Sequence, residues 1–302
     1  METVQSNYKA KQLRWAMHKY KVDLMELQEV GVNWENFTTS NLLTSLLRQG
    51  SDPIRSVKSF NSLETKNIGD TQQGGTATII NDTLTMYVKD TGTDHTHLGQ
   101  WSWYCLEGEP GHSTRVVTAY APCGSNASGV STYFKQAKRC IQNTNLNTTP
   151  KKMFREDLCA VLQQWRARGE RIVLMMDANA NVVDGVLSKM LAKDDIQLKE
   201  AVHSVTSVHG PKTHLRGRES INGIWFTPDL DLQSAAYLSF NADMGYHRPV
   251  MADFTQASLL GVNLPRIVQP AARRLNSQVA RIQDKYIKKW GRSLNLARSR
   301  NV

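Results

Sequence analysis

The sequence lacks long apolar runs. In a chain of 302 residues, no apolar stretch approaches the roughly 18 residues that a membrane-spanning helix needs, so we expect no membrane partner. The opening stretch, residues 1–11, is polar and does not resemble a signal peptide. We therefore expect an intracellular protein, cytoplasmic or nuclear, unless a targeting segment precedes Met1.

Closely spaced cysteine pairs are also absent. The four cysteines, Cys105, Cys123, Cys140 and Cys159, are far apart, and no C-x-x-C pair occurs. Structural zinc sites use such pairs, so this spacing argues against one. The sequence instead predicts reduced thiols in a cytosolic or nuclear protein.

Acidic residues are scarce towards the C-terminus. Residues 258–302 contain ten Lys and Arg residues and one acid, Asp284, and so carry a net charge of +9. The whole chain carries +10, which leaves +1 for residues 1–257. Such a cationic segment suits the phosphates of nucleic acids, although a solvated linker has the same composition. We expect a folded domain over residues 1–256 and a basic tail over 257–302, helical from about Gln278 to Trp290.

The hydrophobic pattern mixes helices with strands. Helical periodicity predicts helices over residues 9–20, 34–48, 130–141, 153–168 and 182–191. Thr149, Pro150 and Gly169 are suitable cap and end residues for the fourth of these. Apolar or alternating runs predict strands over 22–30, 76–80, 83–88, 101–107, 115–120, 172–176, 221–227, 236–240 and 248–254. Strands that follow one another directly pair antiparallel, whereas those separated by helices can pair parallel, so we expect helix-covered mixed sheets.

Polar side chains follow several predicted strands at the point where each one ends. Glu29 follows the apolar residues 24–27, Tyr120 ends one strand, and Asp177 and Asn179 follow another. Strand ends and their loops are where binding sites are built, and carboxylate and carboxamide oxygens suit Mg²⁺. Each residue alone is equally typical of an ordinary turn or strand end, so only their combination points to a site.

The order of these motifs resembles the endonuclease/exonuclease/phosphatase superfamily. The matching segments are VDLMELQEV at 22–30, GGTA at 74–77, VTAYAP at 117–122, MDAN at 176–179, SINGIW at 220–225 and HRPV at 247–250. The resemblance covers roughly residues 9–256. Two further segments, QEVGVNW at 28–34 and LPRIV at 264–268, are most similar to endonuclease domains of non-LTR retroelement polyproteins.

The resemblance implies an α/β fold, a four-layer DNase I-like sandwich of two mixed β-sheets flanked by α-helices, here without its first strand. It also implies a metal-dependent phosphodiesterase that nicks DNA, with Mg²⁺ or Mn²⁺ as cofactor and the DNA phosphate backbone as partner. The basic tail would add nucleic-acid contacts. The sequence gives no indication of the oligomeric state.

The resemblance further assigns a role to each site residue. Glu29 would hold the metal ion, which neutralises phosphate charge. Asp177 would orient or deprotonate the attacking water, and Asn179 would fix its geometry. Tyr120 would donate a hydrogen bond to the phosphate or the nucleophile, and His247 would stabilise the charge that develops at phosphorus.

The chain departs from the superfamily pattern at three points. Asn222 occupies the position of the aspartate that orients the histidine, and Tyr246 replaces the aspartate before it. The chain also begins almost at the first helix, without the strand that holds a metal-site asparagine. We therefore expect impaired catalysis, and Asp243 is the nearest candidate for a replacement ligand.

Two alternatives to DNA nicking remain open at this point. The first is a catalytically silent nucleic-acid-binding protein, which the basic tail, Asn222 and Tyr246 all favour. The second keeps the scaffold and changes the substrate to a phosphoinositide, a sphingolipid or an RNA tail.

Overall fold

The structure is a computed structural model that describes residues 7–32, 42–49, 57–61, 75–96, 99–124, 148–242 and 245–262, with 284 and 288. The chain forms two compact units, Met1–Asn263 and Leu264–Val302. The predicted helix over 130–141 lies outside the described residues. Of the predicted tail helix only Asp284 and Lys288 are described, and both are helical. No helix in the described part is long and apolar enough to cross a membrane.

A six-stranded mixed sheet forms the centre of the first unit, in the order β4-β5-β6-β7-β9-β8. Its strands are β4 (Val88–Thr93), β5 (Trp101–Glu107), β6 (Ser113–Tyr120), β7 (Arg171–Asp177), β8 (Lys199–Glu200) and β9 (Asn222–Phe226). β6 and β7 pair parallel, while every other neighbouring pair in this sheet is antiparallel. The long helix that connects β6 to β7 explains this arrangement, because a parallel pair needs a crossover.

That helix, α4 (Pro150–Ala167), begins and ends as the sequence predicts. The side chain of Thr149 accepts a hydrogen bond from the Lys152 N–H, and Pro150 occupies the first turn. Gly169, with φ +77°, follows the end of the helix. The apolar face of α4 packs against one face of the sheet in a core that includes Phe154, Leu158, Leu162, Trp165, Leu174 and Trp225. Beside it lies the short helix α5 (Val186–Leu191), which starts later than predicted because Asn181 Oδ1 accepts the N–H groups of Val183 and Asp184 in a turn.

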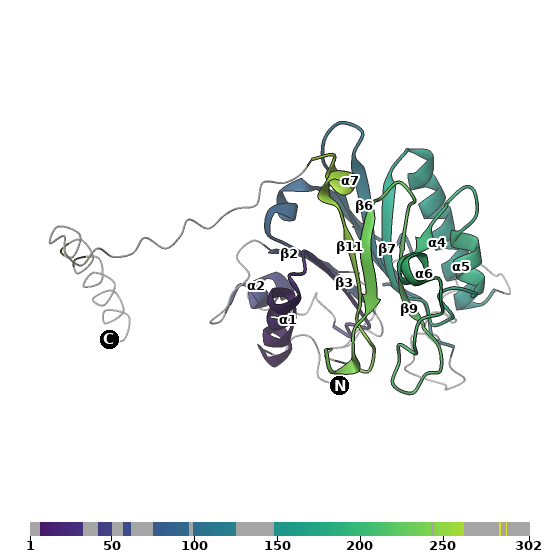
Figure 1. Ribbon diagram of the computed structural model, residues 1–302, viewed down its shortest axis with the longest axis horizontal. Helices are drawn as coiled ribbons and strands as arrows, with labels where there is room; N and C mark the ends of the chain where they lie inside the picture. Colours follow the sequence, from purple (N-terminus) through teal and green to yellow (C-terminus); the bar gives the residue numbers. More distant parts are fainter. Residues whose placement is uncertain are drawn as a thin grey trace. The chain divides into compact units, whose positions relative to one another are not determined.

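A smaller antiparallel sheet forms a second layer, in the order β1-β3-β2. It contains β1 (Leu24–Gln28), β2 (Val57–Asn61) and β3 (Thr76–Asn81). The helices α1 (Asn7–Tyr20) and α2 (Leu43–Leu47) cover its outer side, with Leu13, Met17, Leu43, Leu47, Ala77 and Ile79 in one apolar cluster. Figure 1 shows α1 and α2 on one side of the unit and α4 and α5 on the other. The predicted sandwich of sheets flanked by helices is confirmed.

The second layer consists of two separate sheets and not of one continuous mixed sheet. β10 (Leu232–Tyr237) and β11 (Val250–Phe254) form a separate antiparallel pair, and β11 contacts β9. Within the described residues, β1 pairs only with β3 and β11 only with β10. The expectation of a missing first strand concerns residues ahead of α1, and residues 1–6 lie outside the described part. The first unit also includes α7 (Gln256–Leu260), whose Leu260 carbonyl accepts the Glu109 N–H.

Two predicted strands are wrong in part. Residues 82–87 form the 3₁₀-helix η3 (Asp82–Tyr87) instead of a strand. A strand would place Leu84 and Met86 on the same face, but Leu84 is buried and Met86 is 74% exposed. The strand predicted over 236–240 ends at Tyr237, and Phe240–Ala242 form a second 3₁₀-helix, η4. β2, β8, α6 (Ala201–Thr206) and α7 were not predicted, because each is too short to show a clear period.

Polar side chains, rather than apolar ones alone, fill part of the space between the two layers. Thr76 on β3 is hydrogen-bonded to Ser102 on β5, and Thr78 on β3 to Thr118 on β6. Thr78 Oγ1 lies 2.9 Å from Glu26 Oε2 on β1 and donates to it. Although Glu26 is partly exposed as a residue, its Oε1 is buried and has no hydrogen-bond partner among the described residues. Burial therefore raises the pKa of the Glu26 carboxyl well above its usual range, and the Thr78 bond only partly opposes this.

We expect Glu26→Gln to stabilise the protein increasingly as the pH rises above about 5. Below the unfolded-state pKa of about 4.5, both the folded and the unfolded protein hold the proton. At higher pH only the folded state keeps it, so the free energy of unfolding falls by up to about 1.4 kcal/mol per pH unit until the folded-state pKa is reached. Glutamine has no proton to lose, so thermal unfolding at a series of pH values should show a widening gap between variant and unmodified protein.

Glu156→Gln is the matched control, because Glu156 is exposed on α4 and forms a surface ion pair with Lys152. Its difference from the unmodified protein should vary little over the same pH range. A gap for Glu26→Gln that stays constant or narrows with rising pH would show that the Glu26 carboxyl is not held protonated.

Candidate functional site

Three of the predicted site residues stand side by side at one edge of the central sheet. Tyr120, the last residue of β6, is the register partner of Asp177, the last residue of β7. Asp177 is in turn the register partner of Asn222, the first residue of β9. Because directly paired residues project to the same face, these side chains form one row across three strands.

Glu29 joins this row from the other layer. It directly follows β1, and its Oε1 accepts a hydrogen bond of 2.5 Å from the Tyr120 hydroxyl. Its backbone has φ +53°, a left-handed conformation that is uncommon for glutamate and is typical of functional loops when the fold enforces it. Burial raises the pKa of Tyr120, and the Glu29 carboxylate raises it further, so the phenol keeps its proton and acts as a donor.

Asp177 is buried, with 2% of its surface exposed. Burial raises the pKa of its carboxyl to about 7, an effect that the hydrogen bond from the Asn179 N–H opposes and the Glu29 carboxylate reinforces. Asn179 has φ +45°, a conformation that asparagine tolerates better than most residues, and its side chain donates to the Ala121 carbonyl at 2.8 Å. The Asp177 carboxyl is therefore poised to exchange a proton near neutral pH, and the Asn179 side chain is held in place beside it.

His247 completes the series through Asn222. The distance from His247 Nδ1 to Asn222 Oδ1 is 2.8 Å. Because a carboxamide oxygen only accepts, Nδ1 carries the proton in this pair and Nε2 keeps its lone pair. Burial lowers the pKa of His247, and the neighbouring His214 lowers it further, while Glu29 opposes both. A neutral imidazole is thus favoured, because Asn222 supplies no negative charge to stabilise the cation.

Sequence reasoning did not identify His214. Its ring centroid lies 4.8 Å from that of His247 in an edge-on arrangement, and the two residues also form an isolated antiparallel bridge. The Arg216 backbone N–H donates to His214 Nδ1, with 3.2 Å between the two nitrogens. His214 lies 33 positions before His247, in a polar loop without a motif, so only the folded backbone reveals the contact.

The loop that contains His214 is anchored to the site by Thr213. This threonine is fully buried, and its Oγ1 accepts the N–H groups of Ile221 and Asn222, while its carbonyl accepts the Arg248 N–H. The same loop exposes Lys212, Arg216 and Arg218 beside a single acid, Glu219. These cations lie in the loop next to His247, where they can attract an anion such as a phosphate.

Tyr246, the other departure from the superfamily pattern, is 69% exposed, and its carbonyl accepts the Leu215 N–H. Asp243, the candidate replacement ligand, lies outside the described residues. The described part of the chain contains no group of three or more His, Cys, Asp or Glu side chains able to hold a metal ion. Mg²⁺ is nevertheless often bound by one or two carboxylates, with water and substrate phosphates as its other ligands. Glu29, an exposed carboxylate at the end of the row, fits that open arrangement, whereas a closed protein cage does not form among the described residues.

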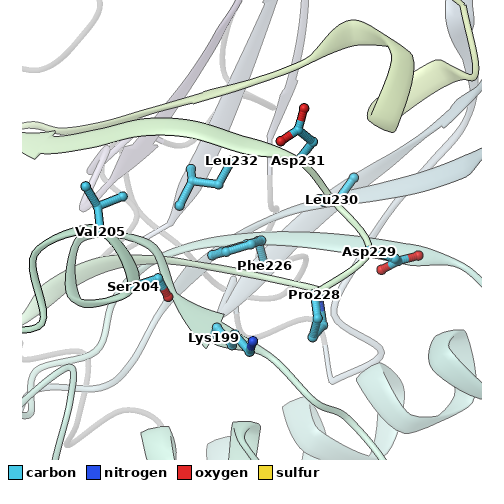
Figure 2. Close-up of a pocket in the computed structure, with 9 residues that line it drawn as sticks. All are labelled: Lys199, Ser204, Val205, Phe226, Pro228, Asp229, Leu230, Asp231 and Leu232. Carbon is cyan, nitrogen blue, oxygen red and sulfur yellow. The ribbon is translucent and has the colours of Figure 1, made fainter.

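A cavity of about 450 Å³ lies elsewhere, at the opposite end of β9 from Asn222. Figure 2 shows its lining, which includes Lys199, Phe226 and Asp229. Asp229 is already paired with Arg171 at 3.1 Å, and none of the predicted site residues reaches this cavity. The predicted residues thus gather at a polar strand edge and not in this hollow.

We expect Asn222→Asp to raise the pKa of His247 by about one to three pH units, because a carboxylate at hydrogen-bond distance stabilises the imidazolium. The measurement is an NMR titration of the histidine rings, with His247 assigned by its own substitution. Asn81→Asp is the matched control, since Asn81 lies beside Asp23 at the start of β1, at the opposite end of that strand from Glu29. Equal shifts in both variants, or none in Asn222→Asp, would contradict the contact.

We compared the chain with protein-family models, with curated protein sequences and with solved structures. No protein-family model matches the sequence, and no curated protein sequence is significantly similar to it. Solved structures are similar in fold. A 3′ phosphatase, NExo, from Neisseria bound to a product DNA hairpin has a TM-score of 0.57 at 14% identity, covering 83% of this chain and 95% of its own. The human nocturnin catalytic domain with bound sulfate has a TM-score of 0.55 at 15% identity, covering 82% and 86%.

A third similar structure is an endonuclease/exonuclease/phosphatase protein from Bacteroides vulgatus, with a TM-score of 0.53 at 13% identity, covering 82% of this chain and 90% of its own. These identities are too low to transfer an activity, but the coverage extends over nearly the whole first unit. The chain therefore has the DNase I-like α/β fold found in endonuclease/exonuclease/phosphatase proteins.

Proposed function

We propose that this chain is a metal-dependent phosphodiesterase that nicks DNA. The observation that supports this most directly is a series that runs from Glu29 to His247. Glu29 is hydrogen-bonded to Tyr120, Tyr120, Asp177 and Asn222 are register partners on adjacent strands, and Asn222 is hydrogen-bonded to His247. These residues come from five separate places in the sequence and meet at one edge of the sheets. The fold that it shares with a phosphatase solved on a DNA hairpin adds support for a nucleic-acid substrate.

Each residue in the series has a role that follows from its surroundings. Glu29 would hold Mg²⁺ or Mn²⁺, and the bound ion would neutralise charge on the phosphate. Asp177, with a pKa of about 7, can take a proton from water at neutral pH, and Asn179 orients that water. Tyr120 donates a hydrogen bond from its protonated hydroxyl, and His247 would stabilise the phosphate when it is protonated, because Nε2 then carries a proton to donate.

We propose further that catalysis in this copy is slow. The neutral Asn222 cannot stabilise a His247 cation, and in a serine protease the loss of the comparable carboxylate lowers the rate by about 10⁴-fold. Tyr246 is a poor ligand for a hard cation, because such ions prefer carboxylate and carbonyl oxygens, and its side chain is largely exposed to solvent. The rate of DNA cleavage should therefore be limited by these two positions.

The biological setting that we propose is target-DNA nicking by the endonuclease domain of a retroelement, in the cytoplasm or nucleus. Its support is the sequence resemblance at residues 28–34 and 264–268. In this proposal residues 1–256 provide the catalytic domain. Residues 257–302 provide a basic tail that adds contacts to nucleic-acid phosphates.

A catalytically silent nucleic-acid-binding protein is the second candidate. It is favoured by the uncharged Asn222, by the exposed Tyr246, and by the absence of a three-ligand metal cluster among the described residues. The two candidates predict the same affinity for DNA and differ only in whether a phosphodiester bond is broken.

The test is conversion of supercoiled plasmid to open circle in Mg²⁺ and in Mn²⁺. We expect slow nicking by the unmodified chain and faster nicking by Asn222→Asp combined with Tyr246→Asp, by up to about 10⁴-fold, because His247 regains its charged partner. Glu29→Gln in the same background should abolish nicking, since it removes the carboxylate proposed to hold the ion.

Asn81→Asp is again the control, and it should leave the nicking rate unchanged. Nicking by the unmodified chain would eliminate the silent candidate. Failure of both the unmodified chain and the double variant to nick, with DNA binding retained, would contradict the nuclease proposal. Competition between duplex DNA and a phosphoinositide head group, a sphingolipid or an RNA tail would then show whether the site acts on another phosphoester.

A further inference from the structure

Helix α1 combines exposed aromatic rings with an unbalanced positive charge. Between residues 7 and 22 the chain has five Lys and Arg residues and no acid. Tyr8 is 60% exposed and Trp15 is 51% exposed, although large aromatic side chains are usually buried. None of the proposed site residues lies on this helix, so the proposed catalysis leaves this surface unexplained.

The exposed residues form one stripe along the helix. Tyr8, Lys11, Trp15 and Lys19 follow one another at intervals of three or four positions, and therefore lie on a single face. The opposite face, with Ala10, Leu13 and Met17, is buried against β1 and β3. We call these four residues the α1 stripe, which extends for roughly 17 Å along the helix axis.

The Trp15 ring is already held in place. The Lys19 ammonium lies 4.4 Å from the centre of the ring, and the Tyr20 ring meets it edge-on with centroids 6.2 Å apart. An aromatic ring that neighbours have ordered loses less conformational entropy when it binds a flat ligand. Because the Lys19 ammonium lies over one face of the ring, a base would stack on the other face, and the ammonium keeps a positive charge near a bound phosphate.

We infer that the α1 stripe binds single-stranded nucleic acid. Bases stack on exposed aromatic rings, and adjacent lysines neutralise the phosphates that join those bases. A duplex fits less well, because its bases are stacked on each other and present no free face. An anionic membrane is disfavoured, since the aliphatic face that would enter lipid is already buried in the core.

The position of the stripe relates it to the proposed catalytic edge. The turn at residues 21–23 connects α1 directly to β1, and Leu13 of α1 shares an apolar cluster with Leu27 and Val30 at the far end of β1, so the helix packs back along the strand. The end of α1 near Tyr8 therefore lies towards the Glu29 end of β1. A strand bound along the stripe would extend towards that edge, although binding to the stripe does not require catalysis.

The test measures the affinity of the full chain for labelled oligothymidylate, and for its duplex with oligoadenylate, in EDTA so that no cleavage occurs. Trp15→Ala should weaken binding of the single strand by about five-fold or more, with little effect on the duplex. Trp15→Phe should retain most of the affinity, because phenylalanine keeps a stacking surface. This pair separates stacking from any effect of the substitution on folding.

The contribution of the lysines is tested by salt dependence. Lys11→Gln combined with Lys19→Gln should reduce the slope of log affinity against log salt by about 1.4 for the single strand, or about 0.7 for each lost phosphate contact. The matched control is Lys189→Gln combined with Lys193→Gln, which removes the same charge from exposed positions at α5, in the opposite outer layer. The control should leave both the slope and the single-strand preference unchanged.

Each outcome decides the inference. Equal affinities for unmodified chain, Trp15→Ala and the lysine pair would overturn it. Binding to phosphatidylserine vesicles is measured for the same variants. If Trp15→Ala lost vesicle binding while its oligonucleotide binding stayed unchanged, the inference would also be overturned, because that result would assign the stripe to a membrane. Failure of both the unmodified chain and the Asn222→Asp plus Tyr246→Asp variant to nick plasmid, with Trp15-dependent binding retained, would contradict the proposed nuclease function and leave this inference intact.

Discussion

The pairing register of β6, β7 and β9 is the constraint on which the candidate site depends. It aligns Tyr120, Asp177 and Asn222 in one row and so determines what Glu29 and His247 can reach. A slip of one residue would turn Asp177 towards the apolar core under α4, because successive side chains point to opposite faces. The fully buried Ile172 and Leu174, which alternate with Val173 and Asp177 along β7, make such a slip costly. Core packing against α4 therefore also fixes the geometry of the polar edge.

Burial has the same electrostatic consequence throughout the space between the two sheets. It raises the pKa values of Glu26, Asp177 and Tyr120 and lowers that of His247, so each group is pushed towards its neutral form. For Glu26 this is a cost in stability that no ligand relieves, because its neighbours are uncharged hydroxyl groups. For Asp177, at the end of β7, the result is a carboxyl that can change protonation state near neutral pH. The same physical effect is thus a structural liability in the interior and chemically useful at the rim.

The sequence predicted what local pattern and family resemblance can specify, and missed what only tertiary contacts decide. The length and apolar face of α4 and its Thr149 cap were evident, as were the strand ends at Tyr120 and Asp177. The segment 83–88 was assigned to a strand because its composition suits one, yet residues 82–87 form a 3₁₀-helix in which tertiary packing buries Leu84 and exposes Met86. The sequence did not indicate His214 as a site residue, because its contact with His247 depends on the hydrogen bonds by which Thr213 holds the loop next to β9. The hydroxyl contacts between the sheets have no sequence signature at all.

The net charge of the domain does not reveal the cluster of positive charge on α1, which the folded chain shows. Residues 1–257 carry a net charge of only +1, which indicated a balanced body with a cationic tail. Yet five of its positive charges fall within residues 7–22 with no acid among them, so the balance holds only as a sum. Electrostatic attraction decays over about 8 Å at physiological salt, so a passing phosphate responds to the nearest surface and not to the total. The helix that covers one sheet therefore presents a cationic, aromatic face whatever the net charge of the domain, and the exposed rings of Tyr8 and Trp15 add a stacking surface to it.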